Sequence, residues 1–204
     1  MILLQLFSRY SKVIITLSCL QTFSISAFAG DIEITSMLGY TNSPELTDKD
    51  RTTEIETTNE PNIAFAFSWK DYPNGQGQIL VNYISRDFID NIDQSTHSFD
   101  TVYAHFSGIA FYKERNYTTT IGMGVGATYF NSDFDNAVYP SVTFALGTRY
   151  TLSENLTFIT EIRAYATLTK DDDTVFCKNE SCIAHFDDTI WLDKQFSIGL
   201  AYSF

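Results

Sequence analysis

The sequence lacks a long apolar run. Beyond residue 29, no stretch approaches the roughly 20 apolar residues that a membrane-spanning helix requires. It also lacks a basic stretch, since 13 Lys and Arg residues stand against 25 Asp and Glu residues, for a net charge of −12. Proteins that bind nucleic acid need basic surfaces to neutralise phosphates. These absences exclude a helical membrane span and argue against a nucleic-acid partner.

Proline is scarce as well, at four residues in 204, whereas phenylalanine (17) and tyrosine (12) are abundant. Aromatic side chains fit the pleated, half-buried surface of a sheet and are enriched in strands. The length suits one domain of ordinary size. The composition therefore predicts a single domain built from strands.

The first 29 residues have the pattern of a secretory signal peptide. Arg9 and Lys12 supply a positive segment, and the apolar run at 13–20 has the expected length. A small-x-small pattern ends at Ala29, where we predict cleavage. Removal of residues 1–29 changes the formal charge from −12 to −14.

The predicted mature domain, residues 30–204, keeps two of the three cysteines, Cys177 and Cys182. A cysteine pair in an exported protein indicates a disulfide. Two alternatives to a cleaved signal are an uncleaved N-terminal anchor and a lipoprotein signal at Cys19. The residues before Cys19 match a lipoprotein signal poorly, so we favour cleavage.

The last ten residues, Gln195–Phe204, alternate between large apolar and small or polar side chains, as a strand does. The apolar face is formed by Phe196, Ile198, Leu200, Tyr202 and Phe204. The chain stops on this face, at an aromatic residue. An unpaired apolar edge invites aggregation in water, whereas a strand that closes a barrel in lipid has no free edge.

Seven earlier segments show a similar alternation. They are 31–40, 63–69, 78–86, 101–112, 117–130, 141–150 and 156–168. Their connections alternate between long (42–60, 88–98, 131–139, 169–192) and short (73–77, 113–116, 152–155). Short turns on one side, long loops on the other and an even strand number are typical of outer-membrane barrels. We therefore predict an all-β fold, an eight-stranded antiparallel up-and-down transmembrane β-barrel.

Charge follows the same division. The first long loop, 42–60, shows no periodicity, and the four long loops together carry −12 of the predicted mature charge of −14. The predicted lipid-facing positions carry no charge.

The register of 101–112 stays open, although we favour an outward face of Val102, Ala104, Phe106 and Ala110. Gly122, Gly124 and Gly126 share one face. Glycine is unfavourable inside a strand unless close approach or curvature requires it, and here we expect it to make room for bulky neighbours inside the lumen.

Four charged residues occupy predicted inward positions: Arg86, Arg149, Glu161 and Arg163. A buried charge must be paired, so we expect an ion network in the lumen. Side chains just fill the interior of an eight-stranded barrel. We therefore expect a plugged lumen. The alternative is a charged lining that gives a channel its selectivity.

Several features together resemble the small eight-stranded outer-membrane β-barrel proteins of Gram-negative bacteria. They are the signal peptide, the DIEIT start, the GVGATYF strand, the late cysteine pair and the aromatic end of the final strand. This group includes the opacity-type proteins and the membrane domain of outer membrane protein A. The resemblance covers residues 30–204. It implies that Gln195–Phe204 is the signal read by the barrel assembly machinery.

Some outer-membrane barrels modify lipid A with a His, a Ser and an acid. Here His105 and Ser107 share a strand face, but no motif accompanies them. We therefore expect His105 to be a polar lumen residue. His97 and His185 fall in predicted loops and are expected to be solvated.

Two acidic regions offer metal ligands in principle. Cys177 and Cys182 lie near His185 and two aspartates, and 171–173 is a run of three aspartates. Neither spacing matches a zinc or calcium motif. A disulfide and a solvated acidic loop are favoured. We expect no catalytic residue, cofactor or metal.

The sequence thus indicates a monomeric, non-enzymatic protein of the outer membrane with a structural or surface-interaction role. Expected partners are outer-membrane lipids and lipopolysaccharide, and the assembly machinery during insertion. The alternatives are a small channel for ions or hydrophobic solutes and, less favoured, a lipid A-modifying enzyme. No residue identifies a ligand of the loops.

Overall fold

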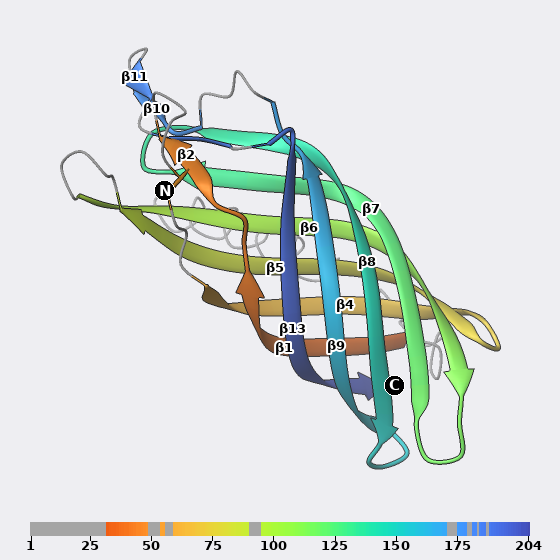
Figure 1. The fold of residues 1–204 in the computed structure, drawn as a ribbon. Coiled ribbons are helices and arrows are strands. Elements are labelled where there is room, and N and C mark those ends of the chain that lie inside the picture. Colours follow the sequence, from red (N-terminus) through yellow and green to blue (C-terminus); the bar gives the residue numbers. More distant parts are fainter. Residues whose placement is uncertain are drawn as a thin grey trace, which may run out of the picture. The chain divides into compact units, whose positions relative to one another are not determined.

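The computed structural model describes residues 32–48, 54–55, 59–89, 95–170, 175–178, 181–182, 184–186 and 188–204. Eight long antiparallel strands close into a barrel (Figure 1). They are β1 (Ile32–Asn42), β4 (Glu60–Tyr72), β5 (Gly75–Ile89), β6 (Thr96–Lys113), β7 (Thr118–Ser132), β8 (Asn136–Thr151), β9 (Leu156–Leu168) and β13 (Ile190–Ser203). The predicted all-β, eight-stranded antiparallel barrel is confirmed. The predicted signal peptide lies outside the described residues.

The first and last strands of the barrel form its seam. β1 pairs with β13 in antiparallel register, with Leu38 opposite Ile198. The Phe204 N–H donates a hydrogen bond to the Ile32 carbonyl oxygen at 3.0 Å. Because β1 also pairs with β4, every barrel strand has two neighbours and no sheet edge is left open.

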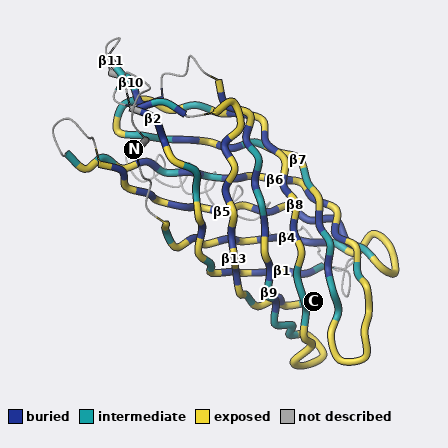
Figure 2. The backbone as a smooth tube through the Cα atoms, in the orientation of Figure 1, coloured by how far each residue is buried: buried dark blue, intermediate teal, exposed yellow. Residues whose placement is uncertain are grey.

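Buried and exposed residues alternate along the strands (Figure 2). The outward side chains are large and apolar, for example Leu38, Phe106 and Met123, which are 57–67% exposed. Apolar surface this continuous is too large for a protein in water but suits contact with lipid. The favoured register of β6 is correct, since Ala104 and Phe106 point outward. Among the described residues, no helix is long and apolar enough to cross a membrane.

The expected long connection at 131–139 is wrong. β7 ends at Ser132 and β8 begins at Asn136, so a tight turn joins them. The Ser132 hydroxyl accepts hydrogen bonds from the backbone N–H groups of Phe134 (3.0 Å) and Asp135 (3.2 Å). This local bonding satisfies the turn, so the strands extend further than their apolar pattern suggested. The long and short connections therefore do not alternate strictly.

Parts of the two longest predicted loops are ordered in small sheets, although the first of these loops shows no periodicity in the sequence. β2 (Leu46–Asp48) and β3 (Glu54–Ile55) come from the first loop and pair with β12 (Ala184–Phe186) from the last. β10 (Cys177–Lys178) and β11 (Ser181–Cys182) form a hairpin. In Figure 1, β2, β10 and β11 lie at the opposite end of the barrel from the C-terminus.

Two glycines of β7 permit close contact with β6. A Cβ atom on Gly126 would overlap the carbonyl oxygen of Ala104, and one on Gly124 would overlap the Ser107 hydroxyl. Any larger residue would push the two strands apart. Close approach to β6 within the barrel wall therefore requires glycine at 124 and 126. A Cβ atom on Gly122 would meet only ordinary contacts of 3.5 Å or more, and the close neighbours are wall atoms of β6 rather than the bulky lumen side chains that we expected.

Candidate functional site: the capped barrel interior

Apolar side chains gather at the loop end of the barrel, in a cluster that we call the aromatic cap. Its members are Leu46, Ile55, Phe88, Phe99, Phe130, Tyr139, Val175, Phe176, Ala184, Phe186 and Trp191. Five belong to the inward faces of barrel strands, and six come from the long connections. The cap therefore joins the two longest connections to the lumen face of the barrel.

Ring contacts, most of them edge-to-face, hold the cap together. Phe176 lies 5.6 Å from Phe88 and 5.5 Å from Phe99, measured between ring centroids. Phe186 lies 5.3 Å from Trp191 and 5.2 Å from Phe130. Such pairs contribute about 0.5–1.5 kcal/mol each beyond the burial of their area. Phe176 and Phe186 thus each contact two strand residues, which fixes them over the barrel mouth.

A disulfide joins Cys177 to Cys182 in the last connection, as the sequence predicted. It closes the β10–β11 hairpin directly after Phe176. Because the cysteines are bonded to each other, the alternative of a zinc site is wrong. Among the described residues, no group of three or more His, Cys, Asp or Glu side chains is placed to hold a metal ion.

A buried ion pair lies just beneath the cap. Arg86 on β5 donates to the Asp193 carboxylate on β13, and both side chains are fully buried. The Tyr103 hydroxyl donates to the same carboxylate oxygen. Arg86 also donates to the Thr101 hydroxyl at 2.6 Å, and its guanidinium carbon lies 5.5 Å from the Phe99 ring centroid. The pair therefore links the polar lumen to the aromatic cap.

The middle of the lumen combines stacked rings and amides. The rings of Tyr103 and Tyr165 stack with centroids 4.0 Å apart. The Asn62 amide donates to Asn82 at 2.9 Å, and the Asn82 amide donates to Gln195 at 2.7 Å. These residues come from β4, β5, β6, β9 and β13. The Tyr103–Tyr165 and Asn82–Gln195 contacts cross the lumen, whereas the Asn62–Asn82 contact joins the neighbouring strands β4 and β5.

Two further ion pairs lie nearer the short turns. Arg163 donates to the Glu161 carboxylate at 2.7 Å, and the Arg163 side chain is 1% exposed. Arg149 donates to the carboxylate of Glu33, and these two side chains remain 13% and 10% exposed. The lumen thus holds paired charges along its length, each surrounded by neutral polar groups.

No protein-family model matches the chain, and no curated protein matches it in sequence. Solved structures do match its fold. Neisserial surface protein A is 8% identical with a TM-score of 0.58, over 85% of this chain and 97% of that one. The outer membrane protein OprG from Pseudomonas aeruginosa is 13% identical with a TM-score of 0.59, over 86% and 96%.

Ail, the attachment invasion locus protein of Yersinia pestis in complex with the heparin analogue sucrose octasulfate, is 10% identical with a TM-score of 0.50. That match covers 84% of this chain and 98% of Ail. The chain has the fold of the small eight-stranded outer-membrane β-barrels. Identities this low establish the fold and leave function to be argued from this barrel's own residues.

All four predicted lumen charges of the barrel, Arg86, Arg149, Glu161 and Arg163, lie on its inner face. Only Glu161 and Arg163 are brought together. Arg86 and Arg149 bind Asp193 and Glu33, which were not in the predicted set. Instead of one network, the described part of the barrel has three separate pairs.

The sequence reasoning missed the start of the final strand. β13 begins at Ile190, five residues before the predicted start at Gln195. Continuing the alternation backward from Gln195 would have placed Asp193 and Trp191 on the inner face. The polar residues Asp193 and Lys194 interrupted the apolar pattern, although one points inward and the other outward.

The histidines of the barrel differ from expectation in part. His105 faces the lumen as predicted, but its Nε2 atom lies 2.9 Å from the Ser141 hydroxyl and not beside Ser107. His97 is half-buried rather than solvated, with its ring centroid 5.1 Å from that of Phe134. His185 is half-buried within β12.

Proposed function

We propose that the protein is a monomeric, non-enzymatic outer-membrane barrel with a structural or surface-interaction role and a plugged lumen. The observation that carries this proposal is the aromatic cap above an ion-paired interior. To open a path, Phe176 and Phe186 would have to leave the cap, and the Arg86–Asp193 pair would have to separate. Separating a buried ion pair costs about 3–5 kcal/mol when one charge is left unpaired.

The second candidate, a small channel, also has an observation in its favour. Several buried lumen atoms in the described strands have no hydrogen-bond partner in the protein, among them Gln76 Nε2, Ser107 Oγ and Tyr165 OH. Buried polar atoms of this kind are ordinarily satisfied by water. A hydrated lumen would suit a channel, but the cap and the ion pair still cross it.

The loop side supports a surface role. The β12–β2–β3 sheet ties the first and last connections together, and the cap fixes them to the strands. Such a platform holds its outer surface in place for a partner. The ligand of Ail is an anionic sugar sulfate. The four predicted loops here are acidic, which argues against that ligand class.

A lipid A-modifying enzyme is the least supported candidate. His105 is 2% exposed, and within the described residues its Nδ1 atom has no hydrogen-bond partner. A catalytic histidine needs an orienting partner and access to the substrate. Mass spectrometry of lipid A from cells with and without the protein tests this point. Unchanged acylation is expected, and a changed acyl pattern would overturn the non-enzymatic proposal.

The final strand is proposed as the signal for the assembly machinery. Its outward face consists of Phe196, Ile198, Leu200, Tyr202 and Phe204, all between 46% and 55% exposed. Deletion of Phe204 should lower the amount of folded barrel in the membrane, since the aromatic end of this face is lost. Replacement of Phe158, which lies outward on β9, by alanine is the control. Equal yields for both variants would contradict the assignment.

Placement of the two ends tests the surface role. An epitope inserted between residues 48 and 54 should bind antibody on intact cells. The same epitope in the 152–155 turn should bind only after lysis. The untagged protein should fractionate with outer membranes and migrate differently on gels before and after heating. A soluble periplasmic protein, or labelling of both ends on intact cells, would overturn the proposal.

A further inference from the structure

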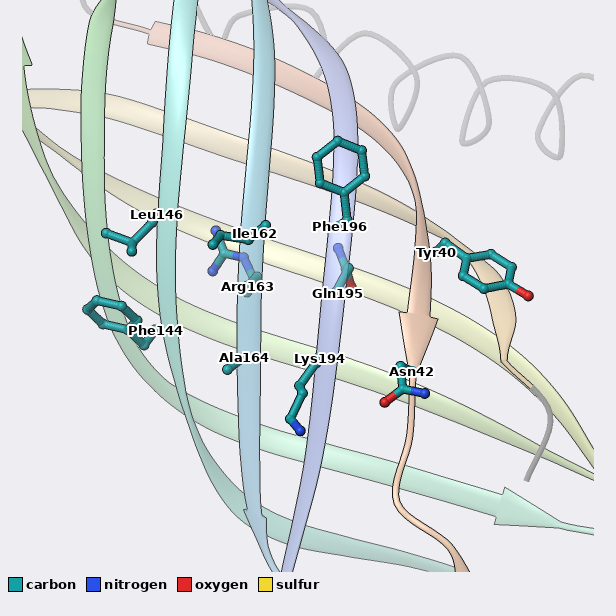
Figure 3. Close-up of a pocket in the computed structure, with 10 residues that line it drawn as sticks. All are labelled: Tyr40, Asn42, Phe144, Leu146, Ile162, Arg163, Ala164, Lys194, Gln195 and Phe196. Atoms are coloured by element: carbon teal, nitrogen blue, oxygen red, sulfur yellow. The ribbon is translucent and has the colours of Figure 1, made fainter. Parts of the chain in front are cut away.

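A shallow hollow of about 640 Å³ runs along the outer wall beside the seam (Figure 3). It lies over β9, where the small side chain of Ala164 separates larger neighbours. Phe144 on β8 and Lys194 on β13 are its direct cross-strand partners. Ile162 and Phe196, which pair with each other, border the hollow on the short-turn side of this row. A small residue between larger ones leaves a furrow with an almost wholly apolar surface.

A single cation stands at the loop-side end of this furrow. Lys194 is exposed on the outer wall, and no ion pair of the described residues includes it. It pairs across the seam with Asn42, two residues beyond the outward Tyr40. In Figure 3 its side chain extends away from Phe196 toward the level of Asn42. Lysine side chains near a membrane surface extend in this way to place the charge among headgroups.

On the opposite side of the barrel, the outer wall formed by β5 and β6 carries negative charge. Asp87 and Asp100 lie outward near the loop ends of β5 and β6, and the Tyr83 hydroxyl donates to Asp100 at 2.8 Å. Ser98 donates to Asp87 at 2.8 Å. An anionic headgroup is therefore attracted to the Lys194 side and repelled from the β5–β6 side. Lipids that surround the barrel without a specific site would not prefer one side of the wall over the other.

We propose that this furrow, with Lys194, binds one molecule of lipid A, taking an acyl chain along Ala164 and a phosphate at the lysine ammonium. This inference rests on the proposed function, in which the long connections face the outside of the cell. In that orientation Lys194 lies in the outer leaflet of the outer membrane. The chemistry required of the ligand is a phosphate headgroup on an acyl chain. Lipid A supplies both in that leaflet.

Native mass spectrometry of the refolded full-length barrel with bis-phosphorylated lipid A tests the proposal. Lys194→Gln should weaken binding about fivefold, as expected for one cation at a membrane surface. Ala164→Phe fills the furrow and should weaken binding at least as much. Lys70→Gln, at the turn end, and Val81→Phe, on the outward face of β5, are matched controls that should bind as the unaltered protein does.

Two results would overturn the site. One is equal binding of lipid A by all four variants, and the other is equal retention of phosphatidylglycerol, which would indicate unspecific annular lipid. Altered gel migration on heating shows that each variant has folded. Because this experiment uses isolated barrels, its failure is distinct from failure of the cellular labelling that tests the proposed function.

Discussion

The lumen and the aromatic cap are adjacent but differ in composition and in origin. The lumen combines paired charges and amides with a smaller apolar cluster that includes Met37, Leu80 and Ile84, all on barrel strands. The cap is apolar, and six of its residues come from connections far apart in the chain. The pairing register of the barrel strands is therefore enough to bring the lumen residues together. The cap forms only when the first and last connections also pack against the strands. We expect the cap to open locally, while the lumen contacts persist until the barrel unfolds.

The largest expected effect lies at the boundary between these regions. Asp193→Ala leaves the buried Arg86 charge unpaired and should lower the free energy of unfolding by about 3–5 kcal/mol. Urea unfolding in lipid vesicles, followed by heat-dependent gel migration, measures this change. Asp188→Ala, at an exposed carboxylate five residues earlier, is the control. Equal midpoints for the two variants would show that the pair does not stabilise the lumen.

Removal of the disulfide should have a smaller effect, and one that distinguishes unfolding of the cap from unfolding of the barrel. The double substitution Cys177→Ser and Cys182→Ser removes the disulfide. From the loop-closure entropy of so short a ring, the disulfide is expected to stabilise the folded state by about 2 kcal/mol. The loss should weaken the cap and leave barrel unfolding nearly unchanged. Trp191 lies in the cap, and Trp69, the other tryptophan, lies outside it.

In a Trp69→Phe background, Trp191 fluorescence should change at lower urea once the disulfide is removed, whereas gel migration should not. The same background with both cysteines retained is the control. A parallel shift of both signals would mean that cap and barrel unfold as one unit.

The smallest effect is expected at the turn end of the lumen. Arg149→Gln removes the cation that pairs with Glu33, but both side chains are partly exposed to solvent. The cost should therefore be about 1 kcal/mol, above that of a surface ion pair but well below that of the fully buried Arg86–Asp193 pair. The same urea titration measures it. A loss as large as that of Asp193→Ala would show that depth in the lumen does not set the strength of these pairs.

The strands and their two faces could be predicted because barrel residues alternate with a period of two, which is visible locally. Arg86, Arg149, Glu161 and Arg163 were assigned to the lumen by this alternation. Their partners were harder to assign, because Arg86 and Asp193 are 107 residues apart and meet only through barrel closure.

The cap could not be predicted in the same way. Phe176 and Phe186 lie among acidic residues, so their segment resembles a solvated loop until strands from elsewhere supply Phe99 and Trp191. Lys194 was missed for a related reason, because a charge inside a strand obscures the apolar pattern that defines it.

Single-channel recording in a planar lipid bilayer tests the central claim, that the cap and the ion-paired lumen close this barrel. Folded protein, verified by its gel migration after reconstitution, should give no resolved conductance steps at either polarity. A wide outer-membrane porin in the same membrane serves as the positive control. Reproducible steps from the unaltered barrel would contradict the account and favour the channel.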